Sequence, residues 1–548
     1  MPSLPLASER LLFTPATPAA HAIPTIFAFP NEYSVGITSL GYQVVWAMLA
    51  SRSDVQVSRL FTNGQESLPS DPELLGFSLS WELDYVNVLN LLEALELPLY
   101  SRDRQASSSF PLVFGGGPVL TANPEPFADF FDVILLGDGE RLVGDFIEAY
   151  KLVRGADRAT QLQHLAQVSG LYVPALYEIC EAEPRGGITG VQPSQPGVPA
   201  LVEKQTYRGS VLSASTVVTE KAAWENIYMV EVVRSCPEMC RFCLASYLTL
   251  PFRVADVEGS LIPAIERGLQ VTNRLGLLGA SVTQHPEFES LLDYLNKPVF
   301  DAVRLSLASV RTNTVTPKLT ETLVKHGAKS ITIAVESGSD RLRHVINKKL
   351  DNQEIIQAAI HAQAGGLSHL KLYGMVGLPS EEREDLEATV AMFEAIKKAA
   401  PGLRLSFGCS TFVPKAHTPF QWFGVNKQAE KRLQFLQKHL RPLGVDFRPE
   451  SYNWSVVQAL ISRGDRRLAK LLERTRHYGD TLGSYRRAFK ELQGTLPDLE
   501  TYVHSYWQPG QPLPWNHLQG PLPEATLIKH LDMAKAHFSP NHTLAWRG

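Results

Sequence analysis

Short apolar runs that end in glycine or serine recur through residues 21–154, separated by stretches with the apolar spacing of helices. Runs of this kind are typical of parallel strands buried on both faces, and the helical stretches supply the crossovers between them. The pattern therefore predicts an α/β domain with a doubly wound, Rossmann-type parallel sheet. Its predicted strands begin at Pro24, Val55, Leu74, Pro111 and Phe131.

A second series of strand and helix patterns occupies residues 223–450. Six apolar runs fit strands, and helical patterns lie between them. An open, parallel (β/α)6 partial barrel is the predicted fold, with its active site at the carboxyl ends of the strands. The predicted strands are 228–233, 275–282, 303–307, 330–335, 370–375 and 403–408.

The remaining segments lack this rhythm. Residues 1–20 are rich in Pro and Ala and predict a loose N-terminal arm, and the Pro- and Gly-rich residues 155–222 predict a connecting subdomain. Residues 451–548 are helical in pattern and basic and end in a Pro-rich tail, which predicts a helical C-terminal region.

Composition narrows the classes of function. The chain has 548 residues, 20% of them charged, and a net charge of −4, so its overall charge does not indicate a nucleic-acid-wrapping protein. Five cysteines, a low and odd count, indicate a reducing compartment rather than a disulfide scaffold. Residues 1–20 show no apolar stretch of the kind found in signal peptides, and no apolar run approaches the length of a membrane span. We therefore expect a cytoplasmic protein with no membrane partner.

Three cysteines form a Cys-x3-Cys-x2-Cys motif directly after the first predicted barrel strand. They are Cys236, Cys240 and Cys243, with Phe242 before the last thiol. Three thiolates are one fewer than the four ligands that an iron–sulfur cluster or a structural zinc ion takes. A [4Fe–4S] cluster with one open iron can bind and reduce a small molecule, and this is the favoured prediction. A zinc site completed by Cys180, Cys409 or a histidine is the alternative.

Together with the predicted strand ends, this motif resembles that of the radical S-adenosylmethionine (radical SAM) proteins. Leu277–Ser281 lies where the family has a second-strand glycine motif, Ile331–Asp340 matches its fourth-strand motif, and Leu372–Pro379 resembles its fifth-strand segment. The resemblance implies an enzyme that cleaves S-adenosylmethionine with a [4Fe–4S] cluster and starts radical chemistry, methylation or a related modification, on an unknown substrate. It also implies a reductase or a flavodoxin- or ferredoxin-type electron donor.

The resemblance also assigns roles to single residues. The cysteines are the catalytic metal ligands, and the residues implied to bind S-adenosylmethionine are Phe242, Gly279, Ser306, Glu336, Ser337, Tyr373, Met375 and Gly377. Each has a structural alternative, because a Glu at a strand end often begins the next helix and a Gly-Leu-Pro run is often a simple turn. Arg304 is expected at the same mouth of the barrel, and Lys371 either meets the cofactor carboxylate or is solvated.

The N-terminal domain resembles the cobalamin-binding-type domain that precedes many radical SAM domains. Phe29–Tyr42, Phe114–Pro118 and Leu136–Glu140 carry this resemblance, and their glycines would let the backbone approach a flat ligand. The Asp-x-His-x-x-Gly motif, whose histidine binds cobalt, is absent. Two alternatives therefore remain. Either the domain binds cobalamin without a histidine ligand to cobalt, or the sheet carries no cofactor. The whole chain resembles a largely uncharacterised bacterial group of B12-binding-domain-type radical SAM proteins.

Other classes of function remain as alternatives, namely an iron–sulfur electron-transfer protein, an RNA-modifying protein without cobalamin and a zinc-binding interaction module. Residues 463–490 carry nine Lys and Arg against three Asp and Glu. We expect a solvated, amphipathic helix pair there that packs its Leu and Phe residues on the barrel. RNA binding, with Tyr478, Tyr485 and Phe489 stacking bases, is less favoured.

Two more features near the sixth predicted strand have alternatives. Cys409 is expected to be a buried apolar residue rather than a hydrogen-atom donor. The segment 412–422 either closes over the barrel mouth or packs on the C-terminal region. Its polar and aromatic residues are Lys415, His417, Gln421 and Trp422.

Overall fold

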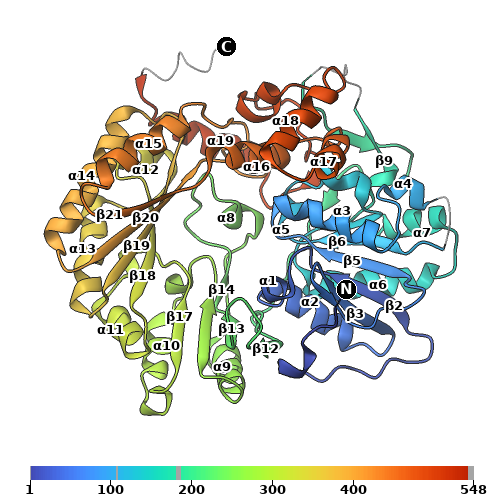
Figure 1. Cartoon of the computed structure of the whole chain (residues 1–548), viewed down its shortest axis with the longest axis horizontal. Coiled ribbons are helices and arrows are strands. Elements are labelled where there is room, and N and C mark those ends of the chain that lie inside the picture. The colour runs from blue at the N-terminus through green and yellow to red at the C-terminus, as the bar shows by residue number, and fades with distance from the viewer. Residues whose placement is uncertain (1, 106–108, 181–186, 541–548) are drawn as a thin grey trace.

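A seven-stranded sheet forms the centre of the N-terminal domain, on the right in Figure 1. Its strands are β2 (Ile23–Ala28), β3 (Val55–Phe61), β4 (Gly64–Gln65), β5 (Leu74–Ser78), β6 (Leu112–Gly116), β7 (Val133–Leu135) and β8 (Leu171–Tyr172). In the computed structural model, which describes residues 2–105, 109–180 and 187–540, they run in the order β4-β3-β2-β5-β6-β7-β8. The five central strands are parallel, and the edge strands β4 and β8 are antiparallel.

Helices cover both faces of this sheet, so its strands are buried almost throughout. The helices of the domain are α1 (Tyr33–Gly36), α2 (Leu40–Ala50), α3 (Tyr85–Ala94), α4 (Ser101–Arg104), α5 (Pro118–Ala122), α6 (Gly139–Val153) and α7 (Arg158–Leu165). α2, α6 and α7 pack on one face, and α3 and α5 pack on the other. The predicted doubly wound domain is confirmed.

The N-terminal arm and the connector differ from their expected form. Glu9–Leu11 forms β1, which pairs with β12 (Val217–Thr219). The Glu9 carboxylate accepts two hydrogen bonds of 2.9 Å from the buried Arg59 guanidinium, which fixes the arm because a buried charge requires a partner. Moreover, α7 and β8 belong to the first domain, which therefore extends past residue 154. The other connector strands are β9 (Tyr177–Ile179), β10 (Val191–Pro193) and β11 (Val202–Glu203).

Seven parallel strands, one more than predicted, form the barrel on the left in Figure 1. They are β13 (Ile227–Glu231), β16 (Arg274–Leu278), β17 (Arg304–Leu307), β18 (Ser330–Glu336), β19 (His369–Val376), β20 (Arg404–Thr411) and β21 (Val445–Pro449). Hydrogen bonding divides them into sheets of three and four strands, joined by a single bridge between Val310 and Ile333. The predicted partial barrel is confirmed, with β21 and this division as corrections.

The strands of the barrel have two distinct faces. Leu275, Ile333, Leu372 and Phe407 point outward into an apolar core shared with the helices, and the alternate residues point into the barrel interior. The covering helices are α9 (Ile262–Leu269), α10 (Phe288–Leu295), α11 (Pro317–Lys325), α12 (Asp340–Val345), α13 (Asn352–Ala364), α14 (Arg383–Ala399) and α15 (Ala429–Leu440).

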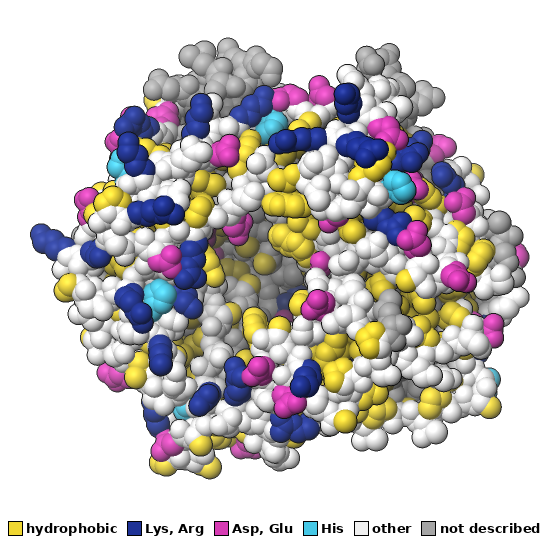
Figure 2. All heavy atoms as spheres, in the orientation of Figure 1, with side chains coloured by type: hydrophobic (Ala, Val, Ile, Leu, Met, Phe, Trp, Pro, Cys, Tyr) yellow, Lys and Arg dark blue, Asp and Glu magenta, His cyan; other side chains and the backbone are white. Residues whose placement is uncertain are grey.

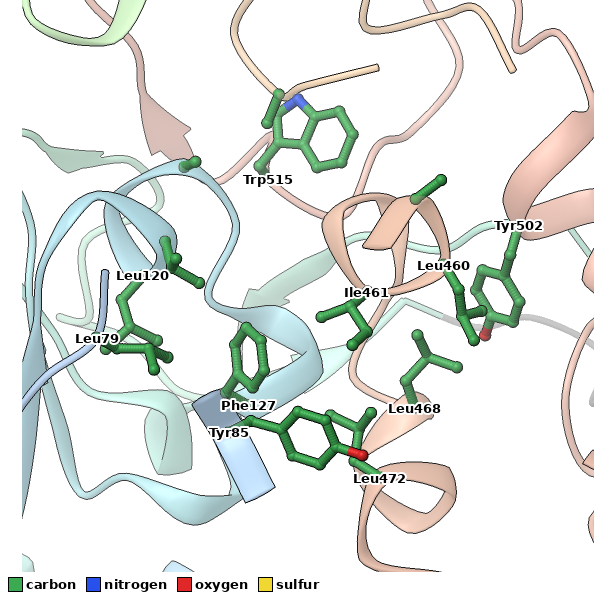
Figure 3. Packing of buried hydrophobic residues seen from close by; sticks show 14 of the residues in the cluster. Leu79, Tyr85, Leu120, Phe127, Leu460, Ile461, Leu468, Leu472, Tyr502 and Trp515 are labelled. Carbon is green, nitrogen blue, oxygen red and sulfur yellow. The ribbon is translucent and has the colours of Figure 1, made fainter. Parts of the chain in front are cut away.

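The C-terminal region joins the two α/β units across the top of Figure 1. Its elements are α16 (Tyr452–Arg463), α17 (Leu468–His477), α18 (Leu482–Glu491), β22 (Leu518–Gln519) and α19 (Glu524–Lys535). Figure 3 shows side chains of α16 and α17 facing those of the N-terminal domain; they are Leu460, Ile461, Leu468 and Leu472 on one side and Leu79, Tyr85, Leu120 and Phe127 on the other. Within the described ranges, every helix is too short or too polar to cross a membrane.

Candidate active site

The cysteine loop lies near the centre of the molecule, beside the hollow between the two α/β units (Figures 1 and 2). β14 (Val233–Arg234) leads into the loop and α8 (Leu244–Leu248) follows it. Ser235 and Met239 have left-handed backbone conformations, with φ of 70° and 54°, which bend the loop sharply. The loop therefore stands at the carboxyl end of β13, where parallel sheets hold their active sites.

Two residues that the sequence analysis missed fix this loop to the end of α12. The Arg241 guanidinium donates to the carbonyls of His344 and Val345 at 2.7 and 2.8 Å. Asn347 donates from Nδ2 to two carbonyls of the loop at 3.0 and 2.9 Å. Arg241 lies inside the cysteine motif, so its sequence position indicates a role in the loop. The sequence around Asn347 indicates no such role. These bonds set the orientation of the loop.

All three cysteines of the loop are free thiols. Burial raises the pKa of Cys240 to about 12 and also raises the pKa of Cys243, and charge on the neighbouring thiols adds to both shifts. Without a bound cation these two thiols are protonated at neutral pH, so iron, which binds thiolates, would have to displace their protons. Three grouped thiols are the donor set that an iron–sulfur cluster requires. Among the described residues, no three Cys, His, Asp or Glu side chains converge as ligands of a single metal ion.

An ion pair lies beside the thiols, at the end of β18. Lys348 Nζ is 3.0 Å from Glu336 Oε1, and Glu336 has a left-handed φ of 65° at a bulge in the strand. Burial opposes the charge of Lys348, but Glu336 and Cys240 offset it and raise the pKa of the lysine. The Lys348 charge in turn limits the rise in the pKa of Cys240. Glu336 and the thiols are thus parts of one site.

Three predicted residues have backbone roles in this structure. The Ser337 hydroxyl accepts a hydrogen bond from the Ser339 N–H, as expected at the start of a helix. Gly279, with a φ of 150°, follows β16, and a Cβ there would lie 2.6 Å from the Val233 carbonyl oxygen. Its lack of a side chain lets this strand end pack beside the strand that enters the cysteine loop. Gly377 donates its N–H to Glu381 Oε2 at 2.6 Å.

The other predicted residues divide between the barrel interior and the apolar core. Ser306 on β17 and Tyr373 on β19 are exposed on the inner face, and Met375 is half-buried there. Phe242 packs at the edge of the apolar core that includes the C-terminal helices. The inner face therefore presents a hydroxyl, an aromatic ring and a thioether within one barrel.

Glu381 gives a testable dependence of stability on pH. Burial raises the pKa of Glu381 from 4.5 to about 7, despite its ion pair with Arg432. The folded protein therefore binds one more proton than the unfolded chain between these pH values. The free energy of unfolding should fall as pH rises from 4.5 to 7, with a contribution of roughly 3 kcal/mol from this group. Urea unfolding of wild type and Glu381→Gln across this range measures it.

The control for this measurement is Glu387→Gln, which changes an exposed glutamate on α14. Glu387→Gln should keep the wild-type pH dependence and Glu381→Gln should flatten it. Identical curves for the two variants would contradict the assignment.

A cavity of about 230 Å³ lies at the carboxyl edge of the N-terminal sheet. Phe77, Phe114 and Val143 line it together with Arg234, which binds Glu140 at 2.6 Å and so ties the cysteine loop to this domain. Pockets that enclose a drug-sized ligand measure roughly 300–1,000 Å³. This cavity by itself is therefore too small to enclose a whole corrin ring.

Glycines at this edge serve backbone packing. Gly117 and Gly137 have φ of 113° and 112°, and a Cβ would collide with the carbonyl oxygens of Leu79 and Gln205, respectively. Contact with other parts of the chain thus accounts for both glycines, and both also line the cavity at this edge.

The segment 412–422 packs on the C-terminal region, which is the second of the two alternatives that the sequence left open. Lys415 binds Glu82 and donates to Ser462 Oγ at 2.9 Å, and Trp422 is fully buried. Gln421 accepts a hydrogen bond of 2.9 Å from Trp515 Nε1. His417 is buried nearby.

Cys409 and the basic residues 463–490 also have structural roles. Cys409 points outward from β20 into the apolar core, as expected, and burial raises its pKa. Arg463 and Arg466 are buried, and Tyr485 bonds to Tyr85 at 3.0 Å, so much of this region packs against the N-terminal domain rather than on the barrel.

Two known protein families match this chain, one in the N-terminal domain and one in the barrel. Residues 45–174 match the family described as radical SAM proteins, N-terminal, and residues 230–393 match the radical SAM superfamily. An uncharacterised protein of Methanocaldococcus jannaschii is 26% identical over 448 residues, which are 81% of this chain and 89% of that protein. An uncharacterised methyltransferase of Pyrococcus horikoshii is 25% identical over 290 residues, 50% of this chain and 56% of the relative.

Among solved structures, the radical SAM methyltransferase TsrM from Kitasatospora setae, with cobalamin and a [4Fe–4S] cluster bound, matches with a TM-score of 0.50. The two are 12% identical, and the match covers 73% of this chain and 77% of TsrM. At this identity the likeness concerns the fold. Both matched families are families of radical SAM proteins, so the chain belongs to the radical SAM enzymes, and its fold resembles that of TsrM.

Proposed function

We propose that the protein cleaves S-adenosylmethionine reductively with a [4Fe–4S] cluster held by Cys236, Cys240 and Cys243, and so starts methylation or a related modification of a substrate in the barrel interior. The observation that carries this proposal is the grouping of three free thiols, of which Cys240 is buried, on a fixed loop at the carboxyl end of β13. When bound, such a cluster supplies the electron that breaks a carbon–sulfur bond of the sulfonium.

The residues of the chain hold and orient the reactants. Arg241 and Asn347 fix the loop, and Lys348 keeps a positive charge beside the thiols. Glu336, held by Lys348, and Ser337 and the Gly377 backbone are proposed to bind S-adenosylmethionine at the strand ends. Ser306, Tyr373 and Met375 would then line the path to the substrate.

The proposal predicts formation of 5′-deoxyadenosine. The full chain is purified and reconstituted without oxygen, its iron, sulfide and cobalt are measured, and dithionite and S-adenosylmethionine are added. We expect four irons per chain for the cluster and 5′-deoxyadenosine in chromatography with mass detection. An intact, reduced cluster that yields no 5′-deoxyadenosine would contradict the proposal and favour an electron-transfer protein. Bound zinc without iron would favour an interaction module.

Cobalamin-dependent methyl transfer is the second candidate, favoured by the fold shared with TsrM and by the relative described as a methyltransferase. The small N-terminal cavity does not support it. Cobalt in the same measurement distinguishes the two, since one cobalt per chain is expected with cobalamin and none without it. The electron donor for either reaction would be a reductase or a flavodoxin- or ferredoxin-type protein.

A further inference from the structure

Cationic side chains line the end of the barrel interior that lies away from the cysteine loop. Arg274, Arg304 and Arg404 are the first residues of β16, β17 and β20, and Lys371 is the third residue of β19. Each alternates with residues that face the helices, so each points to the inner face. Figure 2 shows Lys and Arg side chains gathered along the barrel side of the central hollow.

These four cations form two groups. Arg274 and Arg304 are register partners on neighbouring strands, and Lys371 lies two residues after His369, the register partner of Arg404. Cα atoms of paired residues on adjacent strands are about 5 Å apart, so the side chains of a group can reach one anion. Between the groups, β18 presents uncharged residues to the interior.

Within the described part of the chain, none of the four cations forms an ion pair with a carboxylate. The neighbouring acid, Asp446 on β21, accepts a hydrogen bond of 2.8 Å from Arg448 instead. The surrounding charge is positive: burial, and then Lys371, Arg404 and Arg448, lower the pKa of His369. Arg304 and Arg404 are exposed, so these cations are accessible to an anion from solution, and their shared positive charge favours binding of one.

Toward the cysteine loop, the inner face of the barrel carries uncharged side chains in place of the cations. Beyond the cations it presents the hydroxyls of Ser306 and Thr332, and then Tyr373 and Met375. Lys371 and Met375 are four residues apart on one strand, which corresponds to about 13 Å. An anion held by the cations therefore leaves room for an uncharged part of the same molecule between it and the cysteine loop.

We propose that the substrate is a phosphate-bearing molecule whose phosphates bind Arg274, Arg304, Lys371 and Arg404 while the part to be modified lies toward the cysteine loop. The inference rests on the proposed function, because that function places the reaction at the carboxyl ends of these strands. Paired guanidinium groups bind phosphate oxygens in a fixed geometry. A phosphate monoester carries nearly two negative charges at neutral pH, so two phosphates match four cations, whereas a carboxylate carries one charge.

Binding is tested on the full chain by calorimetry at low salt, with tripolyphosphate, a ten-residue oligouridylate and citrate as probes. The test variant is Arg304→Gln/Arg404→Gln, and the matched control is Arg141→Gln, which removes a charge from the exposed face of α6. We expect tripolyphosphate or oligouridylate to bind wild type and the control equally, and to bind the double variant at least about tenfold more weakly. The probe that binds identifies the source of the phosphates, a small molecule or a nucleic acid strand.

A second measurement needs no variant. Phenylglyoxal modifies exposed arginines, and peptide mass spectrometry reads each position. The bound phosphate probe should protect Arg304 and Arg404 but not Arg141. No binding of either phosphate probe, binding of citrate alone, equal binding by the double variant, or uniform protection would overturn the proposal. Since binding is read without turnover, failure to form 5′-deoxyadenosine would contradict the proposed function and leave this result interpretable.

Discussion

Cys240→Ala is expected to prevent assembly of the iron–sulfur cluster and to lower formation of 5′-deoxyadenosine by more than about 100-fold. Changes to the outer partners of metal ligands cost about 10–100-fold, and loss of a ligand itself should cost more. Cys240 is buried, lies on the fixed loop and has Lys348 beside it. No other thiol of the loop can replace it, because Cys236 and Cys243 are proposed ligands themselves.

The experiment measures iron and sulfide content, visible absorbance and 5′-deoxyadenosine in parallel. Cys180→Ala is the control, since Cys180 is a half-buried free thiol outside the loop. The control should equal wild type in all three readouts. A Cys240→Ala protein that assembles a full cluster and cleaves S-adenosylmethionine at the wild-type rate would show that these three thiols are not the ligand set.

Arg466→Met is expected to lower the free energy of unfolding by about 3–5 kcal/mol. Arg466 Nε donates to Glu125 Oε2 at 2.9 Å, and the Arg466 guanidinium donates to the Tyr177 carbonyl at 2.7 Å. Both charged groups are buried, and Glu125 also accepts a hydrogen bond of 2.5 Å from Tyr172. Methionine would leave the Glu125 carboxylate buried without its cation, which costs more than the pair itself contributes.

Urea unfolding compares this variant with Arg474→Met, which alters a half-exposed arginine of α17, the helix that follows Arg466; this arginine lies 3.5 Å from Glu491. The control should change the free energy of unfolding by less than about 1 kcal/mol. Glu125→Gln/Arg466→Met should recover part of the loss, since no unpaired charge remains. Equal losses for Arg466→Met and the control would mean that the buried pair does not stabilise the contact between the N-terminal domain and α17.

Hydrophobic pattern alone predicted the strands of both α/β units well, because parallel strands covered by helices are apolar over most of their length. β21 was not predicted, because Asp446 and Arg448 alternate with its apolar residues. The exposed inner face of this strand allows such charged residues. The pairing of β1 with β12 could not be predicted either. It depends on the buried contact between Glu9 and Arg59, which are fifty residues apart in sequence.

For the candidate site, the spacing of the cysteines predicted the residues that share one loop. It did not predict the residues elsewhere in the chain that contact this loop. Lys348, Arg241 and Asn347 gain their roles from contacts that form only after folding. The sequence could not show the packing role of Gly137, because a glycine that accommodates Gln205 looks the same in sequence as a glycine that accommodates a ligand. Counting charges likewise could not distinguish the buried Arg466 from a solvated arginine.

The packing of α16 and α17 on the N-terminal domain also affects how the chain is made. Phe127 and Tyr85 lie beside Ile461 and Leu472, which leave the ribosome about 330 to 390 residues later, on the order of half a minute at typical rates of synthesis. Until then the growing chain exposes an apolar surface on an otherwise completed domain. Chains that end before α16 would keep that surface, so early termination should yield aggregates or chaperone-bound fragments instead of a free N-terminal domain.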